Sequence, residues 1–231
     1  MLVPYKFTYF IGALLFFVYW LYFWIRFGDN RRQMIVFSIV FAILGPISGI
    51  AWFTKDWWYP DTILGYRTGI EDILLGFSNG GVASVVFLFF YQEKENINTK
   101  INIFKGFFPL ILIILVTTVV FIFTPINSFY SNCFGIVVAL AYVFWRRPDL
   151  FRISLLSGIL MMIISAPIYL LLVYISPGWV ERTWMLDKLS GIVWLGAPIE
   201  DLIWYFFVGA SISTMYPYLS GQRYIFRKNN S

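Results

Sequence analysis

Long apolar runs separated by short polar stretches organise the whole chain. An α-helix needs roughly 20 residues to cross about 30 Å of hydrocarbon, and each run is close to that length. Seven such runs can be read, at residues 9–25, 34–53, 70–91, 107–124, 129–145, 153–175 and 190–216. The first is too long and too aromatic for a cleaved signal peptide, so we expect it to stay as a helix. The pattern predicts an all-α membrane protein with seven transmembrane helices.

Two parts of the chain carry versions of one sequence, and each version places two adjacent acids at the start of an apolar run or within one. The shared pattern is W-x-x-D-x-x-x-G followed by I-E-D. It occupies residues 58–65 and 70–72 in the first copy, and residues 184–191 and 199–201 in the second. Because apolar membrane segments rarely keep carboxyl groups without a use for them, the leading candidates for catalysis are these acids: Glu71, Asp72, Glu200 and Asp201.

The repeat extends beyond the acids. Trp24 and Trp145 each lie at the end of the first helix of a half, and Pro46 and Pro167 each lie deep in the second. Helices one to three therefore match helices five to seven, and the fourth is a spacer that lets both halves run in the same direction. Such a 3+1+3 parallel repeat usually places its site between the halves, so the two glutamates are expected to face each other. The predicted units are residues 1–92, 93–125 and 126–231.

Composition and charge support a membrane location. Hydrophobic residues make up 60% of the chain and charged residues 13%, which leaves too little polar surface for a soluble domain. The basic residues favour one side of the membrane, with 12 of 17 after odd-numbered helices: Arg26, Arg31, Arg32, Lys94, Lys100, Lys105, Arg146, Arg147, Arg152, Arg223, Arg227 and Lys228. The positive-inside rule then places the N-terminus outside the cell membrane and the C-terminus in the cytoplasm. The net charge of +5 comes from these basic loops, which are expected to attract anionic lipid. The charge therefore indicates no nucleic-acid partner.

The chain lacks the residues that several kinds of cofactor and metal site require. The chain has no histidine and a single cysteine, Cys133, so His-ligated zinc or haem and a thiolate metal cage are excluded. No G-x-G-x-x-G or G-K-[ST] sequence is present, which argues against a bound nucleotide. Lys188 lies at the outer end of the last run rather than in its middle, which argues against a retinal Schiff base. We therefore expect no metal and no cofactor, and carboxyl chemistry remains.

The surroundings of the acids favour a proton donor. Burial disfavours the charged form of a carboxyl group, and no Lys or Arg falls mid-membrane to neutralise these acids, Arg67 being about one turn outside Glu71. At least one of the four is therefore expected to be protonated at neutral pH and able to act as a general acid. Aromatic rings near the second pair could stabilise a carbocation. The candidate substrate-binding residues are Pro198, Trp204, Tyr205, Trp194, Phe207 and Asn79.

The second acid pair lies in a sequence that resembles a known family motif. Residues 198–205, P-I-E-D-L-I-W-Y, are similar to the P-x-E-[ED]-x-x-[aromatic]-[aromatic] motif of the small integral-membrane lycopene cyclases. Those enzymes consist of two three-helix halves, fused or on separate chains. The resemblance implies acid-catalysed cyclisation of the ends of a hydrophobic polyene within the bilayer, without net redox change. It also implies that Glu200 and Asp201 are the motif carboxyls, with Glu71 and Asp72 as their counterparts.

The first-half copy departs from that motif. Gly69 stands where the family has proline, and Leu75 and Gly76 stand where it has aromatic residues. These changes keep both acids but alter the expected shape of the pocket.

Other interpretations remain open. A 3+1+3 arrangement with buried acids also suits a proton-coupled transporter of a small solute, and a non-catalytic family member would bind a carotenoid or prenyl lipid without converting it. Trp57, Trp58, Trp179 and Trp184 are read first as an aromatic belt at the outer interface. The sequence carries no signal of an oligomeric state.

Overall fold

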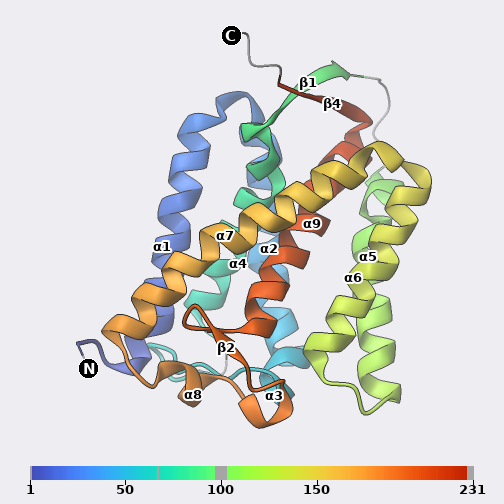
Figure 1. Cartoon of the computed structure of the whole chain (residues 1–231). Coiled ribbons are helices and arrows are strands. Elements are labelled where there is room, and N and C mark those ends of the chain that lie inside the picture. The colour runs from blue at the N-terminus through green and yellow to red at the C-terminus, as the bar shows by residue number, and fades with distance from the viewer. Residues whose placement is uncertain (1, 67, 97–102, 228–231) are drawn as a thin grey trace.

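The computed structural model describes residues 2–66, 68–96 and 103–227, and helices dominate it (Figure 1). Six helical stretches are long and apolar enough to cross a membrane, in agreement with the expected membrane character. The long helices are α1 (Tyr5–Arg26), α2 (Arg31–Ser48), α4 (Ile70–Val85), α5 (Ile103–Phe123), α6 (Ser128–Arg146), α7 (Phe151–Ile175) and α9 (Ile199–Ser220). The six stretches correspond to these helices, with α5 included from Gly106 onward, except for α9, which carries two acids in its first turn.

Shorter elements connect the long helices. A π-helical turn, η2 (Gly49–Phe53), and the single turn α3 (Thr54–Asp56) follow α2, and α8 (Trp179–Thr183) follows α7. The remaining turns are η1 (Gly28–Asn30), η3 (Val86–Phe89), η4 (Pro148–Leu150) and η5 (Leu186–Lys188). Of the basic residues named above, Arg67, Lys100 and Lys228 lie outside the described residues.

The first three and last three long helices run through the molecule in the same order of directions. Figure 1 shows α1, α4, α6 and α9 rising from the end where α1 begins, and α2 and α7 descending towards that end. The loops that contain the repeated pattern therefore lie together at one end, and the basic residues that follow α1 and α6 lie at the other. Below, the end with the repeated pattern is called the acid end.

The prediction of a last helix over residues 190–216 was wrong for residues 190–198, because α9 begins only at Ile199. Residues before Ile199 form a hairpin of β2 (Val193–Trp194) and β3 (Ala197–Pro198), joined by two residues with positive φ, Leu195 and Gly196. Positive φ at both positions is what a two-residue hairpin turn requires. Pro198 is the N-cap of α9. Because proline disfavours helical geometry in the residue before it, the helix does not extend back past this position.

The third predicted helix, residues 70–91, ends early. It changes to the 3₁₀ turn η3 and then to strand β1 (Tyr91–Asn96), which pairs antiparallel with β4 (Gln222–Phe226). This small sheet joins the segment after α4 to the segment after α9 at the end opposite the acid end (Figure 1).

Glycines bring α2 and α4 into close contact. A Cβ added at Gly76 would collide with the carbonyl group of Phe41, and one added at Gly80 would collide with the carbonyl group of Phe37. Small residues at a helix interface allow backbones to approach in this way, and Gly76 and Gly80 have the G-x-x-x-G spacing typical of such interfaces.

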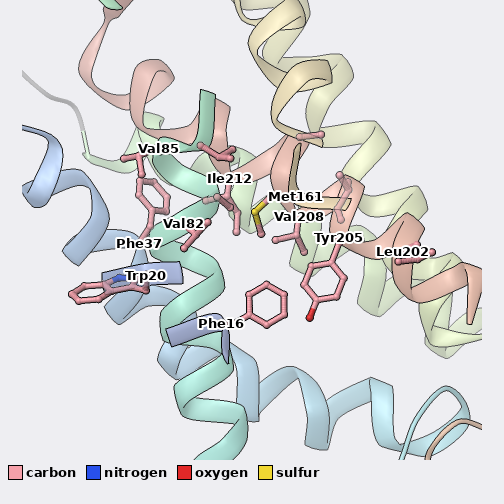
Figure 2. Packing of buried hydrophobic residues seen from close by; sticks show 14 of the residues in the cluster. Phe16, Trp20, Phe37, Val82, Val85, Met161, Leu202, Tyr205, Val208 and Ile212 are labelled. Carbon is pink, nitrogen blue, oxygen red and sulfur yellow. The ribbon is translucent and has the colours of Figure 1, made fainter. Parts of the chain in front are cut away.

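The core lies where helices of both halves meet. Figure 2 shows Phe16 of α1 beside Tyr205 of α9, with Val82 of α4 and Met161 of α7 close by. The rings of Phe16 and Tyr205 are stacked, with centroids 5.1 Å apart and planes 7° from parallel. This contact packs the first helix directly against the last one.

We predict that Gly76→Ala lowers the free energy of unfolding by about 1–3 kcal/mol, because the added methyl group must push α2 away from α4. The measurement is thermal unfolding of the purified protein in detergent. Gly28→Ala is the control, because the nearest atom to its added methyl is the end of the Arg31 side chain, 4.0 Å away. Equal unfolding temperatures for Gly76→Ala and the wild type would contradict the prediction.

Candidate active site

Asp201 is held by side chains of its own half. It is buried in the first turn of α9, and its Oδ1 accepts a hydrogen bond of 2.8 Å from the indole nitrogen of Trp184. The hydroxyl of Tyr169, on α7, donates to Oδ2. Both carboxyl oxygens therefore have neutral donors, as a buried acid without a cation requires.

Asp72 is held in a related way in the first half. It is buried in the first turn of α4, and the hydroxyl of Tyr9 donates to its Oδ1 over 2.9 Å. Its Oδ2 accepts a hydrogen bond of 2.8 Å from the backbone N–H of Gly69. Proline has no N–H, so Pro198 cannot make the equivalent bond in the second half. Where the family motif has proline, the first copy has Gly69. Asp72 therefore accepts a backbone N–H, whereas Asp201 accepts the indole N–H of Trp184.

Glu71 and Glu200 do not face each other, so this expectation was wrong. Oε1 of Glu71 accepts the backbone N–H of Ile63, and Oε1 of Glu200 accepts that of Ser190, each over 2.7 Å. Tyr130 adds a longer bond of 3.4 Å to Oε1 of Glu200. The loop before each helix folds back over the helix start, and its N–H donates to a glutamate that is itself buried and needs a donor. Each glutamate therefore points into the loop of its own half.

Two cavities meet at the acids, one small and one large. The small cavity, of about 60 Å³, has Asp201 and Tyr205 in its wall. The large cavity, of about 180 Å³, has Asp72 and Asn79 in its wall. Neither glutamate lines either cavity. The partition between the cavities consists of residues that line both: Tyr9, Phe53, Trp58, Leu75 and Trp204.

Tryptophans of both loops cover the acids. Trp58 and Trp184 form a β-bridge between the two halves, and their rings stack with centroids 6.1 Å apart. Trp57 and Trp179 are both buried. The interpretation of these residues as an aromatic belt was therefore wrong for Trp57, Trp179 and Trp184, which pack over the site instead of facing lipid headgroups.

The predicted substrate-binding residues divide into two groups. Trp204, Tyr205 and Asn79 lie in cavity walls, and Asn79 lies beside the side chain of Tyr205. Pro198, Phe207 and Trp194 lie in neither wall. Pro198 is buried at the start of α9 and Phe207 is half-buried, whereas the side chain of Trp194 is 52% exposed, because this residue is on the hairpin and not on the helix.

Sequence reasoning missed the two tyrosines that bind the aspartates. Tyr9 lies in the first apolar run, and Tyr169 follows Pro167 by two residues in the sixth, so neither stands out from its aromatic neighbours. Trp184, in contrast, is the tryptophan of the repeated pattern, and that repetition was a usable signal.

Salt bridges do not reach the acids within the described ranges. The ion pairs there are Arg147 with Asp149, at 2.8 Å, and Arg182 with Asp61. Arg67, the cation closest to the first acid pair in the sequence, lies outside those ranges. The aspartates thus have hydrogen-bond donors but no counter-ion among the described side chains.

Comparison with known proteins gives one finding for the second half of the chain. The family model described as lycopene cyclase matches residues 127–219, which include α6, α7 and both acids of the second pair. No curated protein and no solved structure matches the chain significantly. This match, which lies in the second half of the chain, supports an assignment to the lycopene cyclase family.

Proposed function

We propose that the protein is a carotenoid cyclase, an intramolecular lyase or isomerase that closes the ends of a linear polyene of the lycopene type by acid catalysis. The family match supports a cyclase-type function. The observation that carries the mechanism is the pair Asp72 and Asp201. Each is buried, each is hydrogen-bonded to a tyrosine hydroxyl, and each lies in the wall of an aromatic cavity.

The reaction needs a proton donor and a proton acceptor but no oxidant or reductant. A protonated aspartate gives its proton to the terminal double bond, whose electron pair forms the new C–H bond and leaves a cation. A second double bond of the polyene attacks this cation and closes the ring. A proton then leaves a carbon beside the resulting cation for a carboxylate, and a ring double bond forms. Protons and electrons balance, so the product is an isomer of the substrate.

The tyrosines suit an aspartate that changes its protonation state. A hydroxyl group can donate to a carboxylate or accept from a carboxylic acid. Tyr9 and Tyr169 can therefore stay hydrogen-bonded to Asp72 and Asp201 before and after proton transfer. This supports a role for both tyrosines in orienting the acids.

Rings in the partition are placed to stabilise the cation. Trp204 and Trp58 line both cavities, so a cation formed beside either aspartate lies near an indole. The negative face of an aromatic ring attracts a cation most strongly where water is excluded. We propose that Trp204 has this role and that Tyr205 shields the small cavity.

The glutamates were expected to act with the aspartates, and we propose a different role for them. Glu71 and Glu200 each hold a loop backbone N–H and line no cavity. Their bonds fix the loops that bring Trp58 and Trp184 over the site. Proton exchange with the polyene is thus assigned to Asp72 and Asp201.

We also propose that the chain crosses the cell membrane as a 3+1+3 parallel repeat of seven helices, with α9 as the seventh. The order of helix directions in Figure 1 supports this arrangement. The positive-inside rule places the basic end in the cytoplasm, so the acid end, with its four carboxyl groups, lies near the outer surface.

The first test changes each acid to its amide. Asp72→Asn and Asp201→Asn should lower cyclisation about 10²–10⁴-fold, the usual cost of removing a general acid or base. Glu71→Gln and Glu200→Gln should lose less than about tenfold, because a glutamine oxygen still accepts the loop N–H. The measurement is pigment chromatography of cells that accumulate lycopene, normalised to the amount of membrane-inserted protein.

Two outcomes would change the proposal. If the wild type converts lycopene and both aspartate variants stay fully active, the proton donors are misassigned. If the wild type converts no carotenoid but carries a solute with protons into vesicles, the transporter interpretation replaces the enzyme.

A second test concerns the ring face of Trp204. Trp204→Phe keeps an aromatic face and should be milder than Trp204→Leu, which removes it. A cation–π contact in a dry site is worth about 2 kcal/mol, so Trp204→Leu should lose an additional factor of roughly 30 in rate. Equal rates for the two variants at equal protein levels would show that volume, and not the ring face, matters.

A third test concerns orientation. A reporter active only in the cytoplasm, fused after Ser231, should be active, and the same reporter fused before Tyr5 should be inactive. Activity of a periplasm-specific reporter at Ser231 would refute the proposed orientation.

A further inference from the structure

We infer that the large cavity opens sideways into the bilayer between α2 and α5, and that one end of a linear polyene enters there to reach Asp72. Ile47 of α2 forms the edge of this opening. The inference rests on the proposed function, since it describes how that site receives its substrate.

The first observation is a gap in helix packing. Residues of α2 and of α5 both line the large cavity, among them Leu44 and Ile47 on one side and Leu110 and Ile114 on the other. Yet α2 packs on α4, and α5 packs on α6 and α9. Over the described residues, α2 and α5 hardly approach each other. The cavity therefore lies between two helices that do not close it.

The second observation is an irregularity of α2 at this place. Pro46 lies inside the helix, and the five-residue π-helical turn η2 follows directly at Gly49. Proline and π-turns are the usual causes of a local bend in a helix. The matching helix of the second half, α7, also contains a proline, Pro167, but stays α-helical to Ile175. The irregular turn thus belongs to the half whose aspartate faces the large cavity.

The third observation is the exposure of a cavity residue. Ile47 lines the large cavity, and the residue is also 52% exposed. A side chain that does both marks the place where the cavity reaches the surface. Ser48, beside it, donates its hydroxyl to the carbonyl of Gly45 in its own helix. The polar group at this edge is therefore already bonded, and the opening is apolar.

The chemistry of the cavity selects its occupant. The edge carries aliphatic side chains, and the inner part carries Trp58, Trp204 and Asp72. A hydrocarbon chain gains nothing by leaving lipid for water, so it should enter from the lipid side, with its reactive end beside the acid. The cavity, at about 180 Å³, is too small for an entire long polyene. One end therefore enters while the rest of the chain stays between lipid tails.

The test blocks the opening with a large side chain. Ile47→Trp should lower the rate of lycopene cyclisation about tenfold or more, because the indole fills the space that the chain must cross. Ile163→Trp is the matched control, because Ile163 on α7 is 56% exposed and lines neither of the two cavities. Membrane-inserted protein and thermal unfolding in detergent are measured for all variants.

A second measurement does not depend on turnover. The photoreactive residue p-benzoylphenylalanine replaces Ile47 or Ile163, the membranes are loaded with lycopene and irradiated, and adducts are counted by mass spectrometry. We expect more lycopene adduct at position 47 than at position 163.

The outcomes separate the inference from the proposed function. If the wild type cyclises lycopene, Ile47→Trp is as active as Ile163→Trp and adducts form equally at both positions, the lateral opening is refuted while the cyclase stands. If the wild type cyclises no polyene but adducts form preferentially at position 47, the opening stands and the cyclase falls. No cyclisation and no preferred adduct would overturn both.

Discussion

Four carboxyl groups buried in an apolar helical bundle must all find neutral hydrogen-bond donors, and this constraint shapes the acid end of the molecule. Asp72 takes a tyrosine hydroxyl and a backbone N–H, and Asp201 takes a tyrosine hydroxyl and an indole. The glutamates take loop N–H groups. The second oxygen of each glutamate, Oε2, is buried without a hydrogen-bond partner among the described residues. The N–H that each loop supplies by folding back over the helix start therefore matters all the more for these two carboxyl groups. The folded loops in turn carry the tryptophans that enclose the cavities.

The sequence predicted the helices better than the loops. Hydrophobic run length placed α1, α2, α5, α6 and α7 within a few residues, because membrane thickness fixes the length of a spanning helix. The same rule extended the last helix back to residue 190, since the apolar hairpin before Ile199 cannot be told from helix by hydrophobicity alone. The acids were found through their repetition. Their partners Tyr9 and Tyr169 were not, because contact between α1 and α4, or α7 and α9, exists only in three dimensions.

The two halves hold their aspartates differently, and one residue accounts for much of this. Gly69 supplies the N–H that Pro198 lacks, so Asp72 needs only one side-chain donor and Asp201 uses two. Asp201 is therefore enclosed by rings that leave little space beside it, whereas Asp72 borders the larger cavity. A repeated sequence thus gives two unlike environments for the same chemical group.

The strands at the opposite end have a consequence for how the halves are joined. Strand β1 belongs to the first half and β4 ends the second, and they pair antiparallel, with Tyr91 opposite Phe226 and Asn96 opposite Gln222. The ring of Phe87 also meets that of Tyr224 at 4.8 Å. A cut in the chain between residues 96 and 103 would leave one of these strands on each fragment. The sheet is therefore a noncovalent link that duplicates the covalent one, and two separately made polypeptides would already carry the means to assemble.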